Sequence, residues 1–178
     1  MSRIFRFGAL IAVAAISLLL VATAMAAPEN AAAKKPKPKV KSSVHRGQLD
    51  VRGTAANDKI TLRLKPGNKS RLQVDIGSNG SAEFTFKRST FKRIAVRGAA
   101  GTDALSIDER YGAFTGAETT SLFGDAGNDR LTAGSAAELL NGGAGNDTLD
   151  GKRGNDLTEG GAGSDLAVFT GSGAAERF

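Results

Sequence analysis

The sequence predicts an all-β protein in which a region of strands and hairpins leads into a short C-terminal series of stacked turns. Apolar and polar residues alternate with period two from about residue 44 to residue 107, the pattern of half-buried strands. Glycine occupies 23 of the 178 positions and penalises helices. A nine-residue unit repeats after residue 120.

Residues 1–26 have the pattern of a secretory signal peptide. Arg3 and Arg6 give a positive start, residues 10–21 are apolar, and Ala24-Met25-Ala26 provides small residues for cleavage. We therefore expect a secreted protein that begins at Ala27 and has no membrane span after cleavage. The alternative is an uncleaved anchor, because residues 7–27 carry no charge and are long enough to cross a bilayer.

Residues 27–43 form a basic linker in which Lys alternates with Pro. Such a tract neither continues a helix nor buries a face, so we expect a stiff, extended spacer. The alternative is attraction to an acidic polysaccharide or a cell surface. Residues 27–115 hold 18 Lys and Arg against 8 Asp and Glu, whereas residues 116–178 hold 4 against 10. This split predicts different partners for the two halves.

Residues 44–119 are expected to form a β-strand region built around a duplicated unit. LDVRGTAANDKITL, which begins at Leu49, and IAVRGAAGTDALSI, which begins at Ile94, align at a constant offset of 45 residues. Each reads as a strand, a glycine-containing turn that ends in Asp, and a second strand. Residues 65–90 between them are expected to form an inserted basic hairpin, whose face is either solvated or a binding site for polyanions.

Residues 120–178 carry the dense repeat. GGAGNDTLD (142–150) is complete, and GDAGNDRLT (124–132), GKRGNDLTE (151–159) and GGAGSDLAV (160–168) depart from it slightly. AGSAAELLN (133–141) is degenerate but keeps Glu138 in the acidic slot. The acidic slots fall at 129, 138, 147, 156 and 165, nine residues apart without a slip.

These units resemble the hemolysin-type calcium-binding repeat, the glycine-rich nonapeptide of RTX proteins, whose pattern is G-G-x-G-x-D-x-apolar-x. The resemblance implies a parallel β-roll in which two nonapeptides make one coil and calcium lies between stacked turns. It also implies the following metal-site residues: Gly124, Gly127, Asp129, Gly142, Gly143, Gly145, Asp147, Gly151, Gly154, Asp156, Gly160, Gly161, Gly163 and Asp165.

In such a roll, units 18 residues apart share an edge. One edge would hold Asp129, Asp147 and Asp165, and the opposite edge would hold Glu138 and Asp156. Carboxylates stacked about 5 Å apart repel by about 0.8 kcal/mol in water and by about 3 kcal/mol at an effective dielectric constant near 20. A dication reverses that repulsion, and a set of oxygen donors suits calcium. Asp58 and Asp103 fit the same template more weakly, and for them a turn without metal is an equal alternative.

The function expected from these observations is a secreted, calcium-dependent structural or adhesive protein that is not an enzyme. The only histidine is His45, and the chain has neither an H-E-x-x-H zinc motif nor a G-x-S-x-G nucleophile turn. No motif indicates specific binding of nucleic acid. The alternatives are a polyanion-binding or cell-surface-binding module that uses the basic linker and hairpin, and an accessory domain of a secreted hydrolase. The last residues, Glu176 to Phe178, read as the start of a further strand, as in a longer repeat protein.

Overall fold

The structure, a computed structural model, describes residues 39–171. The expected signal peptide, most of the linker and residues 172–178 lie outside the described residues. The described part forms strands and one short 3₁₀ turn. The strands are β1 (Lys41–His45), β2 (Gln48–Arg52), β3 (Lys59–Lys65), β4 (Asn68–Ile76), β5 (Phe84–Lys87), β6 (Arg93–Ala100), β7 (Ala104–Asp108), β8 (Thr119–Ala126), β9 (Arg130–Thr132), β10 (Leu139–Ala144), β11 (Thr148–Asp150), β12 (Leu157–Ala162) and β13 (Leu166–Val168), and the turn is η1 (Arg88–Thr90).

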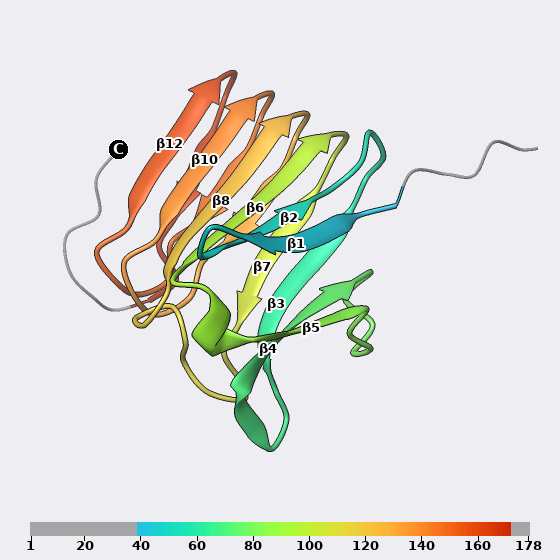
Figure 1. The fold of residues 1–178 in the computed structure, drawn as a ribbon. Coiled ribbons are helices and arrows are strands. Elements are labelled where there is room, and N and C mark those ends of the chain that lie inside the picture. Colours follow the sequence, from blue (N-terminus) through green and yellow to red (C-terminus); the bar gives the residue numbers. More distant parts are fainter. Residues whose placement is uncertain (1–38, 172–178) are drawn as a thin grey trace, which may run out of the picture. The chain divides into compact units, whose positions relative to one another are not determined.

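The strands make two sheets that lie face to face (Figure 1). Sheet A has the order β1-β2-β6-β8-β10-β12, and sheet B has the order β13-β11-β9-β7-β3-β4-β5. From β2 to β12 in sheet A, and from β3 to β13 in sheet B, neighbouring strands are parallel. The antiparallel strands β1, β4 and β5 extend the two sheets at the N-terminal end of the roll.

One strand of sheet A followed by one strand of sheet B makes a coil, and the coils are β2–β3, β6–β7, β8–β9, β10–β11 and β12–β13. The turns that lead from sheet A to sheet B form edge one, and the connections that lead back form edge two. Edge one has short turns, of three residues from the second coil onward. Edge two holds both long excursions, residues 66–92 and residues 109–118. Both long excursions therefore leave the roll at edge two.

The core lies between the sheets and is built from rows of aliphatic side chains. Leu49, Ile94 and their successors alternate with outward-facing residues along each strand, which is why the period of two was visible in the sequence. One row runs Val51, Val96, Leu122, Leu140 and Thr158, and another runs Ile60, Leu105, Leu131, Leu149 and Ala167. The last coil thus contributes the smallest side chains to the core.

Two ion pairs hold the excursions in place, one to the roll and one to each other. Arg63 on β3 pairs with Asp75 on β4, and both side chains are almost fully buried. Nη2 of Arg63 also donates to the carbonyl of Gly80 at 2.7 Å, so the loop that follows β4 folds back over sheet B. Arg88 of η1 pairs with the buried Glu118 at 2.6 Å and thereby joins the first excursion to the second.

The all-β class and the β-roll expected from the sequence are confirmed. The parallel stacking runs unbroken from β2, since β6 pairs with β8 in the same way as β8 pairs with β10. The duplicated units at Leu49 and Ile94 therefore form the first two coils of the same roll. Within residues 39–171 there is no helix with the length and apolar character that a bilayer span needs.

Candidate metal centre

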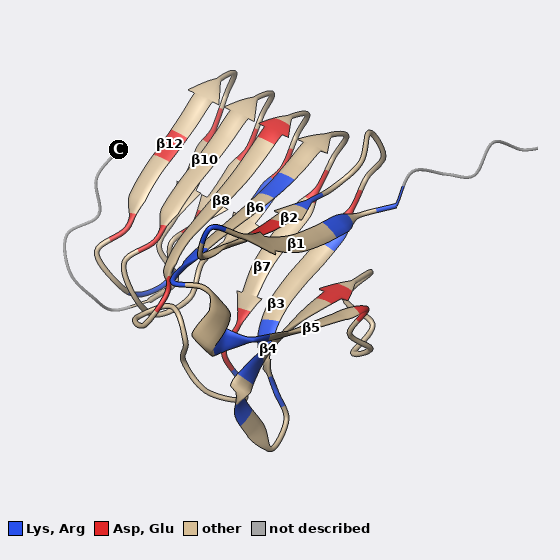
Figure 2. Cartoon of the chain, in the orientation of Figure 1, with Lys and Arg blue, Asp and Glu red and all other residues tan. Residues whose placement is uncertain are grey.

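Edge one carries a single column of aspartates, one from each coil. The backbone N–H of each Asp donates to Oδ1 of the Asp in the following coil: Asp58 to Asp103, Asp103 to Asp129 and Asp129 to Asp147, each at 2.7 Å, and Asp147 to Asp165 at 2.9 Å. The structure therefore brings together the three aspartates placed on one edge from the repeat register, and it adds Asp58 and Asp103 to them. Acidic residues recur in the turns of successive coils (Figure 2).

The second carboxylate oxygen is unpaired in the middle of this column. Oδ2 of Asp103, Asp129 and Asp147 is buried and has no hydrogen-bond donor. A buried oxygen of this kind costs about 1–3 kcal/mol, and more if the group is charged. Such orphaned acceptors are where a bound cation is expected.

Asp58 differs from the other members of the column. Its Oδ2 accepts the backbone N–H of Thr54 at 2.7 Å and the hydroxyl of the same residue at 2.9 Å. Thr54 thus satisfies the oxygen that remains free in the next three coils. Asp58 is therefore a turn residue whose Oδ2 atom is hydrogen-bonded, whereas Asp103 has a free oxygen. The sequence pattern alone gave the same prediction for both positions.

The first glycine of each repeat leaves open the space into which the free oxygen points. A Cβ atom at Gly124 would lie 2.4 Å from Oδ2 of Asp129 and 2.4 Å from the carbonyl oxygen of Gly142 in the next coil. The corresponding distances at Gly142 are 2.3 Å to Oδ2 of Asp147 and 2.5 Å to the carbonyl of Gly160. A carboxylate oxygen and a backbone carbonyl of the next coil therefore converge beside each of these glycines.

The fourth position of the repeat needs glycine for another reason. Gly145 has φ +130°, and a Cβ atom there would lie 2.0 Å from the carbonyl oxygen of Gly127 in the preceding coil. The turn can stack on its neighbour only without a side chain. The other predicted edge-one glycines occupy equivalent places: Gly127 and Gly163 are in the fourth position, Gly160 is in the first, and Gly143 and Gly161 are in the second.

Edge two holds a smaller cluster. The backbone N–H of Glu138 donates to Oδ1 of Asp156 at 2.8 Å, so these two residues are stacked as the register predicts. Oε1 of Glu138 and Oδ2 of Asp156 are both buried without a hydrogen-bond partner. Gly151 is placed against the Asp156 carboxylate and Gly154, at φ +130°, against the carbonyl of Ala136, as in the turns of edge one.

Burial raises the pKa of these carboxyl groups. The pKa of Asp103 rises from 3.8 to about 6, mainly by desolvation, with smaller contributions from the charges of Asp129, Asp58 and Asp125. Desolvation likewise raises the pKa of Asp129, Asp147 and Asp156. It also raises the pKa of Glu138 to about 7. The metal-free protein therefore holds its turn carboxylates at a cost that a cation would remove.

The donor set consists of hard oxygen atoms only. Within residues 39–171, no three side chains of His, Cys, Asp or Glu are grouped so that they could hold a metal by themselves. A site at edge one would combine carboxylates with backbone carbonyls, and a site at edge two would use the carboxylates of Glu138 and Asp156; such oxygen donors suit calcium better than zinc. The unpaired oxygens and the open space beside the first glycines both fit a bound calcium ion.

Asp103 and Glu138 belong to the candidate centre but were not among the metal-site residues that the resemblance implied, although the register had placed Glu138 on the opposite edge with Asp156. Asp103 lies within a unit that lacks the second glycine, and Glu138 belongs to the degenerate unit. The signal for Asp103 was present in its alignment with Asp58 at the offset of 45 residues. That offset did not reveal the column, because the interval from Asp103 to Asp129 is 26 residues and the later intervals are 18.

Comparisons with known proteins agree with this geometry. Residues 114–149 and 132–167 match the family model of the RTX calcium-binding nonapeptide repeat (4 copies). No curated protein and no solved structure matches the chain. The resemblance inferred from the glycine and aspartate register is thus confirmed for the C-terminal coils. The family match covers residues 114–167, and this part of the chain carries the RTX nonapeptide repeat that the sequence register indicated.

Proposed function

We propose that this is a secreted structural or adhesive protein in which calcium held between stacked turns is coupled to folding. The observation that carries the proposal is the column of buried carboxylates at edge one, whose oxygens at Asp103, Asp129 and Asp147 lack any hydrogen-bond donor. Turns that served only to reverse the chain would not need a stack of buried, unpaired carboxylates.

The residues that would hold calcium follow from the position of the free oxygens. At edge one they are the Oδ2 atoms of Asp103, Asp129 and Asp147 and the carbonyls of Gly124, Gly142 and Gly160. Each Oδ2 atom and the matching carbonyl of the next coil converge beside Gly98, Gly124 and Gly142, in that order. Asp165 completes the column and is exposed. At edge two they are Glu138 and Asp156. Bound calcium would supply positive charge that turns the repulsion between stacked carboxylates into attraction.

Coupling to folding is part of the proposal because the donors come from different coils. In the unfolded chain these oxygens are separated by 18 or 26 residues, so stacking creates the site. Ligand that binds only the folded state stabilises that state. We expect affinity in the range of extracellular calcium modules, about 10⁻⁴ to 10⁻³ M, because the sites are few and partly degenerate.

The test is a calcium titration of the purified protein and of the Asp147→Asn variant, with melting temperature and far-ultraviolet circular dichroism as readouts. Asparagine keeps an acceptor for the N–H of Asp129 and removes the charge. Without calcium we expect the variant to be at least as stable as the parent protein, because one buried like charge is gone. In millimolar calcium we expect less than half of the parent's rise in melting temperature.

Asp50→Asn is the matched control, since Asp50 is exposed on the outer face of sheet A and its side chain, within residues 39–171, accepts a hydrogen bond from Gln48 alone. It should respond to calcium like the parent protein. A parent protein whose melting temperature ignores millimolar calcium would refute the coupling.

Secretion and the absence of catalysis belong to the same proposal. The pattern of residues 1–26 supports export. The matched family is a calcium-binding repeat, and His45 lies exposed on β1, opposite Gln48. Residues 1–26 can be fused to a reporter protein to test export. A reporter that stays inside the cell would count against secretion.

A further inference from the structure

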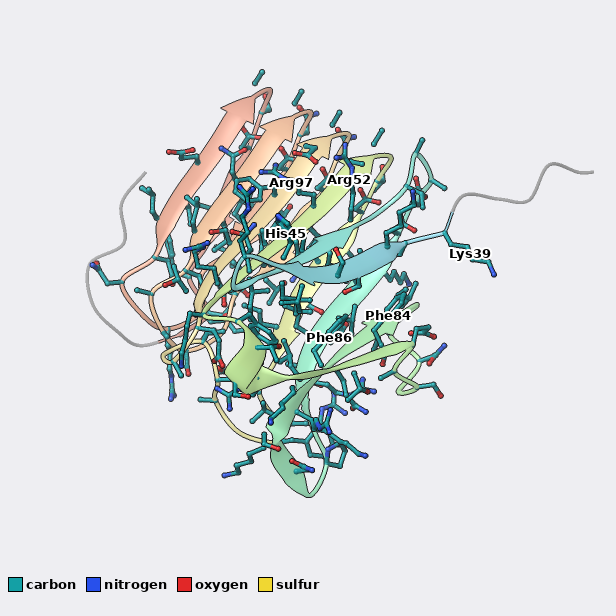
Figure 3. All side chains as sticks on the ribbon, viewed as in Figure 1. Lys39, His45, Arg52, Phe84, Phe86 and Arg97 are labelled. Atoms are coloured by element: carbon teal, nitrogen blue, oxygen red, sulfur yellow. The ribbon has the colours of Figure 1, made fainter. Side chains whose placement is uncertain are left out.

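The outer face of sheet A carries a row of cations that the calcium sites do not use. Lys41, Arg52 and Arg97 lie directly opposite one another on β1, β2 and β6. Neighbouring strands are about 4.8 Å apart, so three positive side chains are held in one line. Figure 3 shows Arg52 and Arg97 close together on these strands. Like charges placed opposite each other destabilise a sheet unless an anion lies between them.

These cations are poorly neutralised by the protein itself. Lys41 and Arg52 are exposed, and neither has a side-chain partner among the described residues. Arg97 is 43% exposed, and its only ion pair is with Asp125 at 3.2 Å. Its guanidinium also lies over the ring of Phe123, 4.0 Å from the centroid, which holds it flat above the sheet.

A second basic group lies four residues away along the same strands. Arg93 on β6 is opposite Gln48 on β2, donates from Nε to that side chain at 3.3 Å, and donates from Nη2 to the carbonyl of Arg46. Four residues of strand span about 13 Å. The two basic groups thus border a strip of sheet A from both sides.

The strip between them holds Asp50, Ala95 and Ser121, which lie opposite one another on β2, β6 and β8. Asp50 lies at the β2 side of the strip and accepts a hydrogen bond from Nε2 of Gln48 at 2.6 Å. Ala95 and Ser121 have small side chains and leave the strip hollow on β6 and β8. They line a groove of about 210 Å³ together with Gln48, Arg93, Arg97 and Phe123. Hydroxyl and amide groups therefore lie on the groove walls, and guanidinium groups lie at both sides.

We propose that this groove, together with Arg52 beside it, binds a linear acidic polysaccharide. Its carboxylate or sulfate groups would lie on Arg52, Arg93 and Arg97, and its hydroxyls on Gln48 and Ser121. Guanidinium groups bind carboxylate and sulfate oxygens in pairs of parallel hydrogen bonds. This inference does not depend on calcium in the turns.

Two other polyanions fit less well. Single-stranded nucleic acid binds through exposed aromatic rings on which bases stack, and here Phe123 is covered by Arg97. A membrane surface would be met by exposed apolar side chains beside the cations. The large exposed apolar residues of residues 39–171 are Tyr111, Leu157, Leu166 and Phe169, and none lines the groove.

The test compares binding of the full chain and two charge-matched variants to immobilised heparin and polygalacturonate at fixed calcium. Arg52→Gln/Arg97→Gln removes one cation that lines the groove and one that lies beside it. Arg71→Gln/Arg130→Gln removes two exposed cations from sheet B. We expect the first variant to bind at least tenfold more weakly and to lose about two units from the slope of log Kd against log salt, and the second to change less than twofold.

A second groove variant, Ser121→Glu, adds a negative charge and keeps every arginine. It should also bind at least tenfold more weakly at an unchanged melting temperature. Equal weakening of the sheet A and sheet B variants would overturn the proposal, because binding would then follow net charge or the basic linker. Stronger competition by single-stranded DNA or by phosphatidylserine vesicles than by the polysaccharides would overturn it as well.

Discussion

Gly124 and the carboxylate of Asp129 share one small space at edge one. The direction in which a Cβ atom would leave Gly124 is the direction in which Oδ2 of Asp129 and the carbonyl of Gly142 point. The aspartate in the sixth position can therefore adopt this orientation only because the first position is glycine. The same pairing occurs at Gly98 with Asp103 and at Gly142 with Asp147.

The Gly124→Ala substitution tests this pairing. The methyl group would lie 2.4 Å from two oxygens, one of them in the backbone, so the coils must move apart. We expect a loss of about 1–3 kcal/mol of unfolding free energy, the usual cost of overpacking, and a weaker response to calcium. Thermal denaturation with and without calcium measures both effects.

Gly116→Ala is the control for that experiment, because its Cβ would meet nothing closer than the side chain of Ala136 at 3.9 Å. It should leave both quantities unchanged. If the two variants behave alike, the first glycine is not specifically required.

The raised pKa values of the turn carboxyls predict an unusual pH dependence for the calcium-free protein. A pKa of about 6 for Asp103 and about 7 for Glu138 means that the folded state binds more protons than the unfolded state between pH 4 and these values. The associated stability is present below about pH 4 and is lost as pH rises through 6 to 7. We expect a higher melting temperature at pH 5 than at pH 7.5 in excess chelator.

Saturating calcium provides the internal comparison, because the metal binds the deprotonated carboxylates. The rise in melting temperature that calcium produces should be larger at pH 7.5 than at pH 5. A calcium-free protein that becomes more stable between pH 5 and pH 7.5 would contradict the prediction.

At the scale of elements, the pair formed by Arg63 and Asp75 anchors β4 and the loop after it to the roll. Asp75 accepts from Arg63 and from the backbone N–H groups of Asn79 and Gly80. Both charges are desolvated, so each depends on the other.

Asp75→Ala should therefore cost about 3–5 kcal/mol, because it leaves the guanidinium of Arg63 buried without its partner. Chemical denaturation measures this loss. The control is Asp108→Ala, which breaks an ion pair with Arg110 on the same outer face. This pair is only partly buried, because the side chain of Arg110 is 69% exposed, and its loss should cost much less. Similar losses in both variants would show that burial does not set the value of the pair.

The strands were predictable where apolar residues alternate, because Leu49, Ile94 and their neighbours obey a local rule of two residues per period. The part of the edge-one column formed by Asp129, Asp147 and Asp165 was predictable because three consecutive coils contain no insertion. The pairing of Arg63 with Asp75 was not predictable. It depends on residues 77–80, which fold back over sheet B and hydrogen bond with both side chains, and no local pattern in the sequence indicates that fold.

At the scale of the whole molecule, stability should decline along the stack. The core rows pass from Leu140 to Thr158 and from Leu149 to Ala167, and Leu166 is 59% exposed. In a solenoid each coil is stabilised mainly by its neighbours, so a coil with a thinner core opens at lower free energy.

Hydrogen exchange can measure this gradient. We expect the amides of β12 and β13 to exchange at least tenfold faster than those of β6 and β7, and calcium to narrow the difference by protecting the turn that ends in Asp165. The central strands β8 and β10 serve as the internal reference. Uniform protection in all coils would show that the stack opens as a single unit.

The stacking register of all five edge-one aspartates, which could not be predicted from the sequence, is also a property of the whole molecule. The same hydrogen bond joins successive aspartates across 45, 26 and 18 residues. A fixed spatial repeat is therefore hidden by a variable sequence repeat, and only the last coils, where the two agree, match the nonapeptide family.

The confinement of both long excursions to edge two makes the two edges unequal in what they tolerate. A residue added to an edge-one turn would shift an aspartate out of its column and push a neighbouring carbonyl away. A segment added between β7 and β8 would only lengthen a connection that already leaves the roll. Edge two is consequently the place where new sequence can enter the protein, by evolution or by design, while the opposite edge keeps its spacing.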